Sequence, residues 1–393
     1  MILLLPIVAA LLPLELPESL RAIEKDKSQE IKVNELKAHV YRLASPEFLG
    51  RRGPGAARTA KHIAEMFKTI GLQPAFGKSY FQPIPNYLRK KKDKLAKTFM
   101  GKNVGAVLPG SDPKFKDEWI VLSAHFDHLG KRGDTLFPGA DDNASGVAML
   151  LEVAERLALS KERPKRTIVF VSFDLEEVGL LGSQHFARNP PRDIKKLKFF
   201  ATADMLGRSM ANVMDEYVFV LGSESAKRLR HLINKVSPAK GLKIGRMGTD
   251  IIGTRSDYGP FRDRKIPFLF FSTGQHSDYH QPSDLPDRID YHRLQKISSW
   301  IGKLTLRLAN DTEVPVWNPK PDLKDMEEVK TIHTLLRRAL DNSDAFPLTK
   351  SRRKSVERIA ADLAGILKRG KITTAERTRL VWTSRLLLIT VFR

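Results

Sequence analysis

The chain has 393 residues, 41% of them hydrophobic, which is enough to bury the core of one large domain or of two smaller ones. It contains no cysteine, so disulfide bonds and cysteine-ligated metal centres are excluded, and any metal must be held by His, Asp or Glu. The formal net charge is +22, but Lys and Arg are spread along the whole chain without a nucleic-acid-binding module, so we expect a solvated basic surface and no specific nucleic-acid partner.

The N-terminal residues 1–20 contain an apolar run, 2–14, that two prolines interrupt. This run is too short to span a membrane, and no basic residues precede it as they do in a secretory signal. We interpret residues 1–20 as a signal-like segment and expect an exported protein. The alternative is an N-terminal segment that packs on the core.

Helical patterns follow, from residue 33 onward and over 56–70. In the second helix, apolar residues recur at the spacing of one helix face. Between the two helices, the Gly-Arg-Arg-Gly-Pro-Gly stretch at 50–55 predicts a turn, because the strand-loop-helix context of a phosphate-binding loop is missing. Residues 79–102 are polar and basic and predict a surface loop or an extended excursion.

Short apolar runs then alternate with amphipathic stretches along the chain. Strands are expected at 103–108, 119–123, 167–173, 199–203, 217–221 and 267–271, and helices at 144–159, 180–187, 223–236 and 292–308. Continuous β-branched and aromatic runs such as 167–173 suit strands that are buried on both faces. The alternation predicts an α/β fold with a mostly parallel central sheet and helices on both faces.

The C-terminal part has a different character, because it is rich in Lys and Arg and poor in glycine. Its pattern predicts helices, for example at 351–368 and 373–385. We therefore expect a main domain over 30–312 and a basic helical extension over 320–393. The extension is expected to cap the domain or to make weak contact with anionic surfaces.

Polar clusters that could carry chemistry follow the carboxyl ends of the predicted strands, which is where α/β sheets bind ligands. A two-metal hydrolase needs two cations about 3.5–4 Å apart, a carboxylate that bridges them, further His or carboxylate ligands and a separate base. The clusters contain residues of the required ligand types, namely His125, Asp142, Glu177, Asp204 and His280. Glu176 is then left over, next to a ligand, as a candidate base.

Each of these signals has an ordinary explanation when it is taken singly. Glu176 and Glu177 could be surface charge, and the acidic residues before the 144–159 helix could be a helix cap. The conjunction of ordered clusters at strand ends favours the metal site. Four other histidines are interpreted as structural or surface residues, and of these His276 lies nearest the site in sequence: His128, His231, His276 and His292.

The residue two positions after the first candidate ligand is a carboxylate. Asp127 lies on the same side of an extended segment as His125. It could therefore accept the ring N–H of His125 and fix its tautomer, which a metal-bound His usually requires.

Five motifs carry a resemblance to a known family. They are Ser-Ala-His-Phe-Asp-His-Leu-Gly at 123–130, Gly-Ala-Asp-Asp-Asn-Ala-Ser-Gly at 139–146, Glu-Glu-Val-Gly-Leu-Leu-Gly-Ser at 176–183, Asp-Met-Leu-Gly at 204–207 and Asp-Tyr-His-Gln-Pro-Ser-Asp at 278–284. With these motifs in this order, the sequence resembles the co-catalytic di-zinc aminopeptidases, which include bacterial leucyl aminopeptidases and are related to glutamate carboxypeptidase and the glutaminyl cyclases. The resemblance covers about 43–310.

The resemblance implies a zinc-exopeptidase (phosphorylase/hydrolase-like) fold that binds two Zn²⁺ ions and acts on peptides with free N-termini. In this family Asp142 would bridge the metals, His125 and Asp204 would complete one zinc site, and Glu177 and His280 the other. The nucleophile would be a bridging hydroxide.

The resemblance also implies three catalytic roles. Glu176 would be the general base and then the acid for the leaving amine, Asp127 would orient His125, and Tyr279 would hydrogen-bond the oxyanion.

The sequence departs from the family pattern at some places. Ser256-Asp257-Tyr258 stands where relatives often have a His after Ser-Asp, 79–102 is too short for an inserted protease-associated domain, and the basic extension matches nothing in the family. Three alternatives therefore stay open. They are a glutaminyl cyclase, which uses one zinc, a carboxypeptidase on the same fold, and a binding homologue without catalysis.

Overall fold

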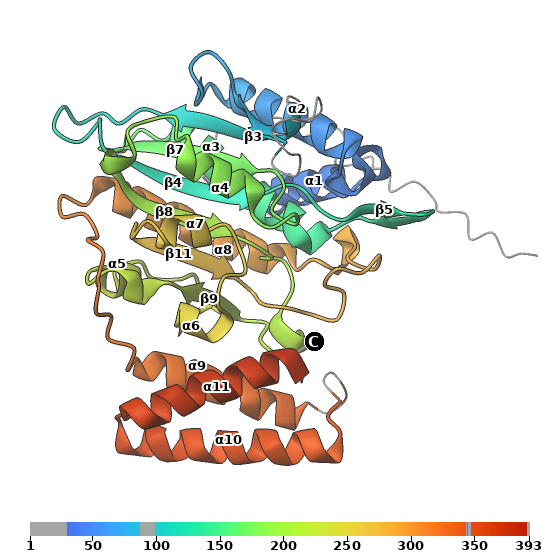
Figure 1. Cartoon of the computed structure of the whole chain (residues 1–393), viewed down its shortest axis with the longest axis vertical. Helices are drawn as coiled ribbons and strands as arrows, with labels where there is room; N and C mark the ends of the chain where they lie inside the picture. The colour runs from blue at the N-terminus through green and yellow to red at the C-terminus, as the bar shows by residue number, and fades with distance from the viewer. Residues whose placement is uncertain (1–29, 87–98, 343, 345–346, 391–393) are drawn as a thin grey trace, which may run out of the picture.

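The computed structural model describes residues 30–86, 99–342, 344 and 347–390 (Figure 1). The signal-like segment 1–20 therefore lies outside the described residues, and so does most of the basic part of the 79–102 excursion. In the described part of the chain, no helix is both long enough and apolar enough to cross a membrane.

The centre of the molecule is a nine-stranded mixed sheet, in the order β1-β3-β7-β4-β8-β11-β9-β10, with β2 paired to β3. The strands are β1 Gln73–Pro74, β2 Phe81–Pro85, β3 Phe99–Leu108, β4 Trp119–His125, β7 Thr167–Phe173, β8 Leu197–Ala203, β9 Tyr217–Leu221, β10 Lys243–Met247 and β11 Phe268–Ser272. The strands β7, β4, β8 and β11 run parallel, as the sequence predicts. The antiparallel strand β3 borders them on one side and the antiparallel strand β9 on the other.

Both faces of this sheet are covered, because alternate side chains of one strand enter two different cores. In β4, Ile120 and Leu122 belong to one apolar cluster, whereas Trp119 and Val121 belong to the other. This is the reason why the parallel strands are continuous apolar runs. The carboxyl end of β4, at His125, is therefore packed between two apolar layers.

The helices of the first layer supply the apolar faces that pack on one side of the sheet: α1 Val33–Leu43, α2 Pro54–Ile70, α3 Gly146–Leu159, α5 Leu229–Asn234 and α8 Tyr291–Asn310. The other side carries shorter helices: α4 Leu181–Arg188, α6 Thr249–Ile252 and α7 Gly259–Arg262. A small antiparallel ribbon, β5 Gly130–Arg132 with β6 Thr135–Phe137, extends from the end of the sheet that carries the polar clusters (Figure 1).

The C-terminal extension consists of α9 Met326–Asp341, α10 Lys350–Arg369 and α11 Thr374–Thr390, and it forms a layer beside β10 (Figure 1). Its apolar residues belong to the second cluster, so it shares a core with the sheet. The approach of α9 to β10 is close, because a Cβ on Gly245 would lie 2.9 Å from Cγ2 of Thr331. The extension is thus docked onto the main domain.

One expectation about elements was wrong, because the stretch 223–236 is a 3₁₀ turn, Ser223–Ser225, followed by the short α5. Within 79–102, which was expected to be a surface loop or an extended excursion, the described residues form β2 and the start of β3. The elements β10, α6 and α7 were not predicted, because each is only four or five residues long and shows no clear period.

Candidate metal centre

The predicted ligands come from different elements and meet beyond the carboxyl ends of the parallel strands. His125 is the last residue of β4, and Asp204 directly follows β8. Glu176 and Glu177 lie in the turn after β7, and His280 lies in the loop after β11. Asp142 belongs to the segment Ala140–Ser145 that leads into α3, and its peptide bond to Asn143 is cis.

Asp142 stands at the middle of this set, because its two carboxylate oxygens face different partners. Its Oδ1 lies 3.4 Å from Nε2 of His125, which is itself 3.2 Å from Oδ1 of Asp204. Its Oδ2 lies 3.0 Å from Nε2 of His280, which is 3.2 Å from Oε1 of Glu177. The arrangement forms two half-sites that share one carboxylate.

These side chains fit a pair of cations. Nε2 of His280 is buried and close to two carboxylates, yet it has no hydrogen-bond partner among the described residues. Buried polar atoms are seldom left unpaired. A nitrogen and carboxylate oxygens that converge in this way are suitable ligands for a bound metal. Nitrogen and carboxylate oxygen are also the donors that zinc accepts when no cysteine is available.

His128 joins the second half-site, although the sequence analysis treated it as structural. Its Nδ1 lies 3.0 Å from Oε1 of Glu177 and 3.7 Å from Oδ2 of Asp142. The ligand atoms of His128, Asp142 and Glu177 are close enough together to hold one ion, as are those of His125, Glu176 and Asp204. His128 therefore offers a further ligand atom beside Asp142 and Glu177.

A buried arginine and a buried aspartate hold the segment that carries Asp142. Arg51 is fully buried and donates to four carbonyl oxygens of this region, those of Phe126 at 2.7 Å, Pro138 at 2.5 Å, Gly139 at 2.6 Å and Asp142 at 3.0 Å. The carboxylate of Asp284 accepts the N–H groups of Asp141 at 2.9 Å and of Asp142 at 3.1 Å. The 50–55 turn, which contains Arg51, thus positions the metal site.

Asp141 and His276 form a second buried pair behind the ligands. Oδ2 of Asp141 lies 3.1 Å from Nε2 of His276, and its Oδ1 accepts the N–H of Gly207 at 2.6 Å. This ties the Ala140–Ser145 segment to the chain that follows Asp204. The other two histidines set aside in the sequence, His231 and His292, are exposed on helices and take no part.

The carboxylate of Asp127 has partners that the sequence analysis did not anticipate. Its two oxygens accept the backbone N–H groups of Glu176 at 2.9 Å and of Glu177 at 3.2 Å. Nδ1 of His125 lies 3.7 Å from this carboxylate and 3.2 Å from the carbonyl oxygen of Asp127. Asp127 therefore fixes the Glu176-Glu177 turn as well as the orientation of the histidine.

The electrostatics of the site set the two glutamates apart. Burial, together with the charges of Asp257 and Asp204, raises the pKa of Glu176 well above its usual value against the opposing effect of His125. Burial also acts to raise the pKa of Glu177, but the hydrogen bond with His128 and the nearby imidazole of His280 outweigh it and lower that pKa. Two neighbouring carboxyls with opposite shifts are the pattern of an acid/base group beside a ligand.

Asp257, which stands in the departing Ser-Asp-Tyr motif, is fully buried, and neither carboxylate oxygen has a hydrogen-bond partner among the described residues. Burial raises its pKa to about 7. Its charge acts on Glu176, so this residue tunes the candidate base.

Tyr279 stacks on His280 with ring centroids 3.9 Å apart. Burial and the charge of Asp142 raise the pKa of its phenol, so the hydroxyl keeps its proton and acts as a donor. The ring also borders a cavity of about 90 Å³ that begins at Asp204. Most of the residues that line this cavity are apolar, and they include Met205, Met210, Phe219, Leu221, Met247, Ile252 and Phe270.

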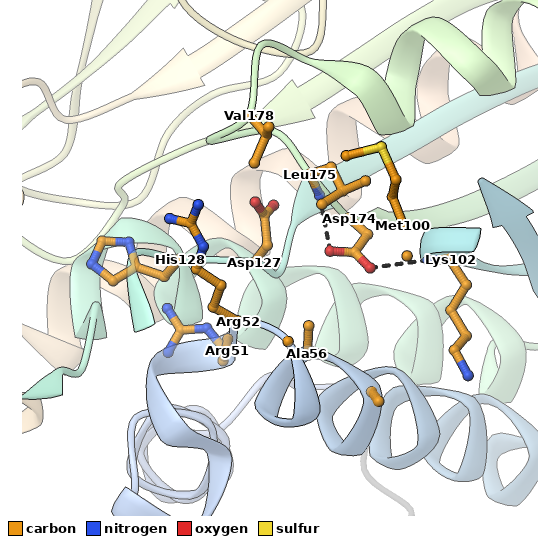
Figure 2. A pocket seen from close by; sticks show the side chains of 13 residues that line it. Arg51, Arg52, Ala56, Met100, Lys102, Asp127, His128, Asp174, Leu175 and Val178 are labelled. Carbon is orange, nitrogen blue, oxygen red and sulfur yellow. Dashed lines mark hydrogen bonds between the residues drawn. The ribbon is translucent and has the colours of Figure 1, made fainter. Parts of the chain in front are cut away.

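A second cavity, of about 240 Å³, lies beside Asp127 and His128 (Figure 2). The first turn of α2, the start of β3 and the turn after β7 line it, and they bring Arg52 and Lys102 to its wall. Burial and the charge of Asp127 raise the pKa of Asp174 at this wall to about 7. Residues of the candidate metal centre therefore border both cavities, Asp204 the smaller one and His128 the larger one.

The fold places the chain among the zinc-exopeptidase-like α/β proteins. The Legionella pneumophila LapA aminopeptidase is 20% identical in sequence, with a TM-score of 0.54, and the match covers 72% of this chain and 73% of that one. The Bacteroides thetaiotaomicron glutaminyl cyclase is 19% identical, also with a TM-score of 0.54, and the match covers 72% of this chain and 99% of that one. At these identities the likeness establishes the fold.

Residues 103–305, just over half of the chain, match the model of Peptidase family M28, and the chain therefore belongs to this family. Among curated proteins, it is 29% identical to the aminopeptidase YwaD of Bacillus subtilis over 185 residues. That match covers 45% of this chain and 38% of the relative, so the chain spans well under half the length of this relative.

Proposed function

We propose that this protein is a zinc-dependent aminopeptidase that removes residues from the free N-termini of peptides. The observation that carries this proposal is the division of Asp142 between two half-sites, with Oδ1 beside His125 and Oδ2 beside His280. A shared carboxylate of this kind is what a two-metal hydrolase requires.

We assign these ligands to two zinc ions, with support from the distances between their side-chain atoms. His125 and Asp204 would hold one ion, Glu177 and His280 the other, and Asp142 both. When bound, zinc supplies a Lewis acid for the scissile carbonyl and lowers the pKa of a water molecule to near neutrality. The name of the B. subtilis relative, aminopeptidase YwaD, supports the activity. Two Pyrenophora relatives, 40% identical over 113 and 111 residues, carry the name "Probable zinc metalloprotease", which supports the metal.

Glu176 is the proposed proton carrier. Its carboxylate takes a proton from the attacking water and returns it to the nitrogen of the leaving amine. Burial and the neighbouring carboxylates raise its pKa, so its carboxyl can hold that proton, and a bound dication would act in the opposite direction to keep the group from staying protonated. Asp127 holds the Glu176 backbone in place, and the Tyr279 hydroxyl donates to the oxygen that gains negative charge.

The two cavities suggest how a peptide would lie. The side chain of the N-terminal residue would enter the cavity beside Asp204 and Tyr279, because most of the residues that line this cavity are apolar. The remaining peptide would extend toward the cavity of about 240 Å³ beside His128, where Arg52 and Lys102 could contact polar groups.

The proposal is tested with zinc-reconstituted protein, a short peptide with a free amino terminus and its N-acetylated twin, both followed by mass spectrometry. Stepwise loss of residues from the free peptide alone is the expected result. Cleavage of both peptides from the other end or internally would replace it by a carboxypeptidase or an endopeptidase. Cleavage of neither would leave a binding homologue.

A glutaminyl cyclase is the second candidate, because such an enzyme shares this fold. The two half-sites favour two metals over the single zinc that a cyclase uses. A zinc content near two per chain, measured by atomic emission after dialysis, supports the peptidase. A content near one, together with cyclisation of an N-terminal glutamine, would support the cyclase.

A further inference from the structure

The apolar cavity has one wall that comes from a short and weakly supported segment. Met247, Ile252 and Arg255 line the cavity. Ile252 is the last residue of α6, which is only four residues long. A single helical turn is marginal by itself, because nucleation fixes several residues for few hydrogen bonds. Other parts of the molecule must therefore hold this wall in place.

The C-terminal extension supplies these supports. The N–H of Gly248 donates to the carboxylate of Glu328 on α9. From α11, Nη2 of Arg377 donates to Oδ1 of Asp250 at 2.8 Å, and the guanidinium of Arg385 donates to the carbonyl oxygen of Asp250 at 2.8 and 2.5 Å. Residues directly before and within α6 are thus bound by two helices of the extension.

The central pair of this support is buried. Arg377 is 5% exposed and Glu328 is 2% exposed, and Nε of Arg377 lies 2.9 Å from Oε1 of Glu328. A Cβ on Gly248 would lie 2.8 Å from Nη2 of Arg377, so the pair reaches the backbone closely. Buried ion pairs are poor sources of stability, and their best-attested use is to fix geometry.

The supports come from outside the part of the chain that defines the family. The family match ends at residue 305, whereas α9 and α11 lie beyond it. The wall itself, from Met247 to Arg255, lies inside the match. The contacts that support this wall of the cavity therefore come from helices outside the family match.

We propose that the C-terminal extension positions the wall of the apolar cavity, so that Arg377, Glu328 and Arg385 act as positioning residues that set the side-chain preference of the peptidase. This inference rests on the proposed function. Without the contacts from the extension, Met247 and Ile252 lose their fixed positions, and a substrate side chain that fills the cavity loses packing against them. A small side chain such as alanine does not reach the wall and is little affected.

The experiment compares zinc-loaded full-length proteins on leucyl and alanyl p-nitroanilide. Arg385→Ala removes an exposed side chain that binds the carbonyl oxygen of Asp250, and Arg377→Lys keeps the buried charge but removes the separate guanidinium nitrogens that contact Asp250 and Glu328. The control is Arg379→Ala, because Arg379 is an exposed arginine on the same helix that does not line the cavity.

We expect each variant to reduce the leucyl-to-alanyl ratio of kcat/KM by about tenfold, mainly through KM for the leucyl substrate, with no change in the control. A merely structural role would lower both substrates in parallel. An unchanged ratio in folded Arg385→Ala and Arg377→Lys would overturn the inference while the proposed function stands. A wild-type protein that hydrolyses neither substrate would instead remove the proposed function, and the inference with it.

Discussion

At the scale of single residues, the site depends on which atoms of a carboxylate face which partner. Asp142 directs its oxygens at two histidines, whereas Asp127 directs its oxygens at two backbone N–H groups. Both residues are buried, so neither can leave an oxygen unpaired without cost. The same type of side chain therefore has two roles. The carboxylate of Asp142 is a candidate metal bridge, and that of Asp127 holds two backbone N–H groups in place.

The proton-carrying role of Glu176 can be separated from metal binding. Glu176→Gln keeps the shape and the hydrogen-bonding capacity of the side chain but removes its ability to exchange a proton. We expect kcat to fall by about 10²- to 10⁴-fold, as for other general bases, with zinc content nearly unchanged. Turnover of a peptide substrate and zinc analysis of the same sample measure both. A near-normal rate would show that another group carries the proton.

His128 gives a prediction about metal retention. Because its Nδ1 lies 3.0 Å from Oε1 of Glu177, His128→Ala should weaken zinc binding by about 10- to 100-fold, whether His128 is a ligand or orients one. Competition with a chromogenic chelator measures this affinity without any substrate. His292→Ala, which removes an exposed histidine of α8, is the control. Equal affinities in the two variants would exclude His128 from the site.

The types of the site residues were predictable, and their contacts were only partly so. His125 and Asp204 could be recognised because each stands at or after the end of a predicted strand. Arg51 and Asp284 could not, because their roles arise from hydrogen bonds to segments far away in sequence. His128 was missed because the direction of a loop side chain is not encoded in residue spacing.

At the scale of elements, period and length decide what can be predicted. Long amphipathic helices such as α8 and uniformly buried strands such as β7 show their period clearly and lie within a few residues of the expected bounds. Four-residue elements such as α6 have no period, because their geometry comes from tertiary contacts. The helix α6, which forms part of the cavity wall, could therefore not be predicted from the sequence.

The packing of α9 against the sheet can be tested by removing one side chain. Leu336 is fully buried in the core that the extension shares with the sheet, so Leu336→Ala should lower the free energy of unfolding by about 2–5 kcal/mol. Denaturant titration followed by circular dichroism measures this change. Leu159→Ala, at a leucine that is 42% exposed, should cost much less. Similar small losses in both would indicate that α9 unfolds independently of the sheet.

At the scale of the whole molecule, two groups at or beside the candidate site, His280 and Asp174, hold protons more tightly when the chain is folded. Burial alone would lower the pKa of His280, but the nearby carboxylates of Asp142 and Glu177 outweigh it and raise that pKa to about 10. Burial and the charge of Asp127 raise the pKa of Asp174 to about 7. In both groups the folded chain binds protons that the unfolded chain has released, so stability falls as pH rises.

This linkage predicts an opposite response to metal. The contribution of His280 is complete below its ordinary value of 6.5 and is lost as pH rises through about 10, and that of Asp174 declines between 3.8 and about 7. The thermal midpoint of chelator-treated protein should therefore fall between about pH 6 and 9. Zinc displaces the His280 proton and binds more tightly as pH rises, so the stabilisation by zinc should widen over the same interval. Calorimetry of treated and zinc-loaded samples measures the difference between their thermal midpoints, and a difference that narrows with pH would mean that the metal does not displace the proton of His280.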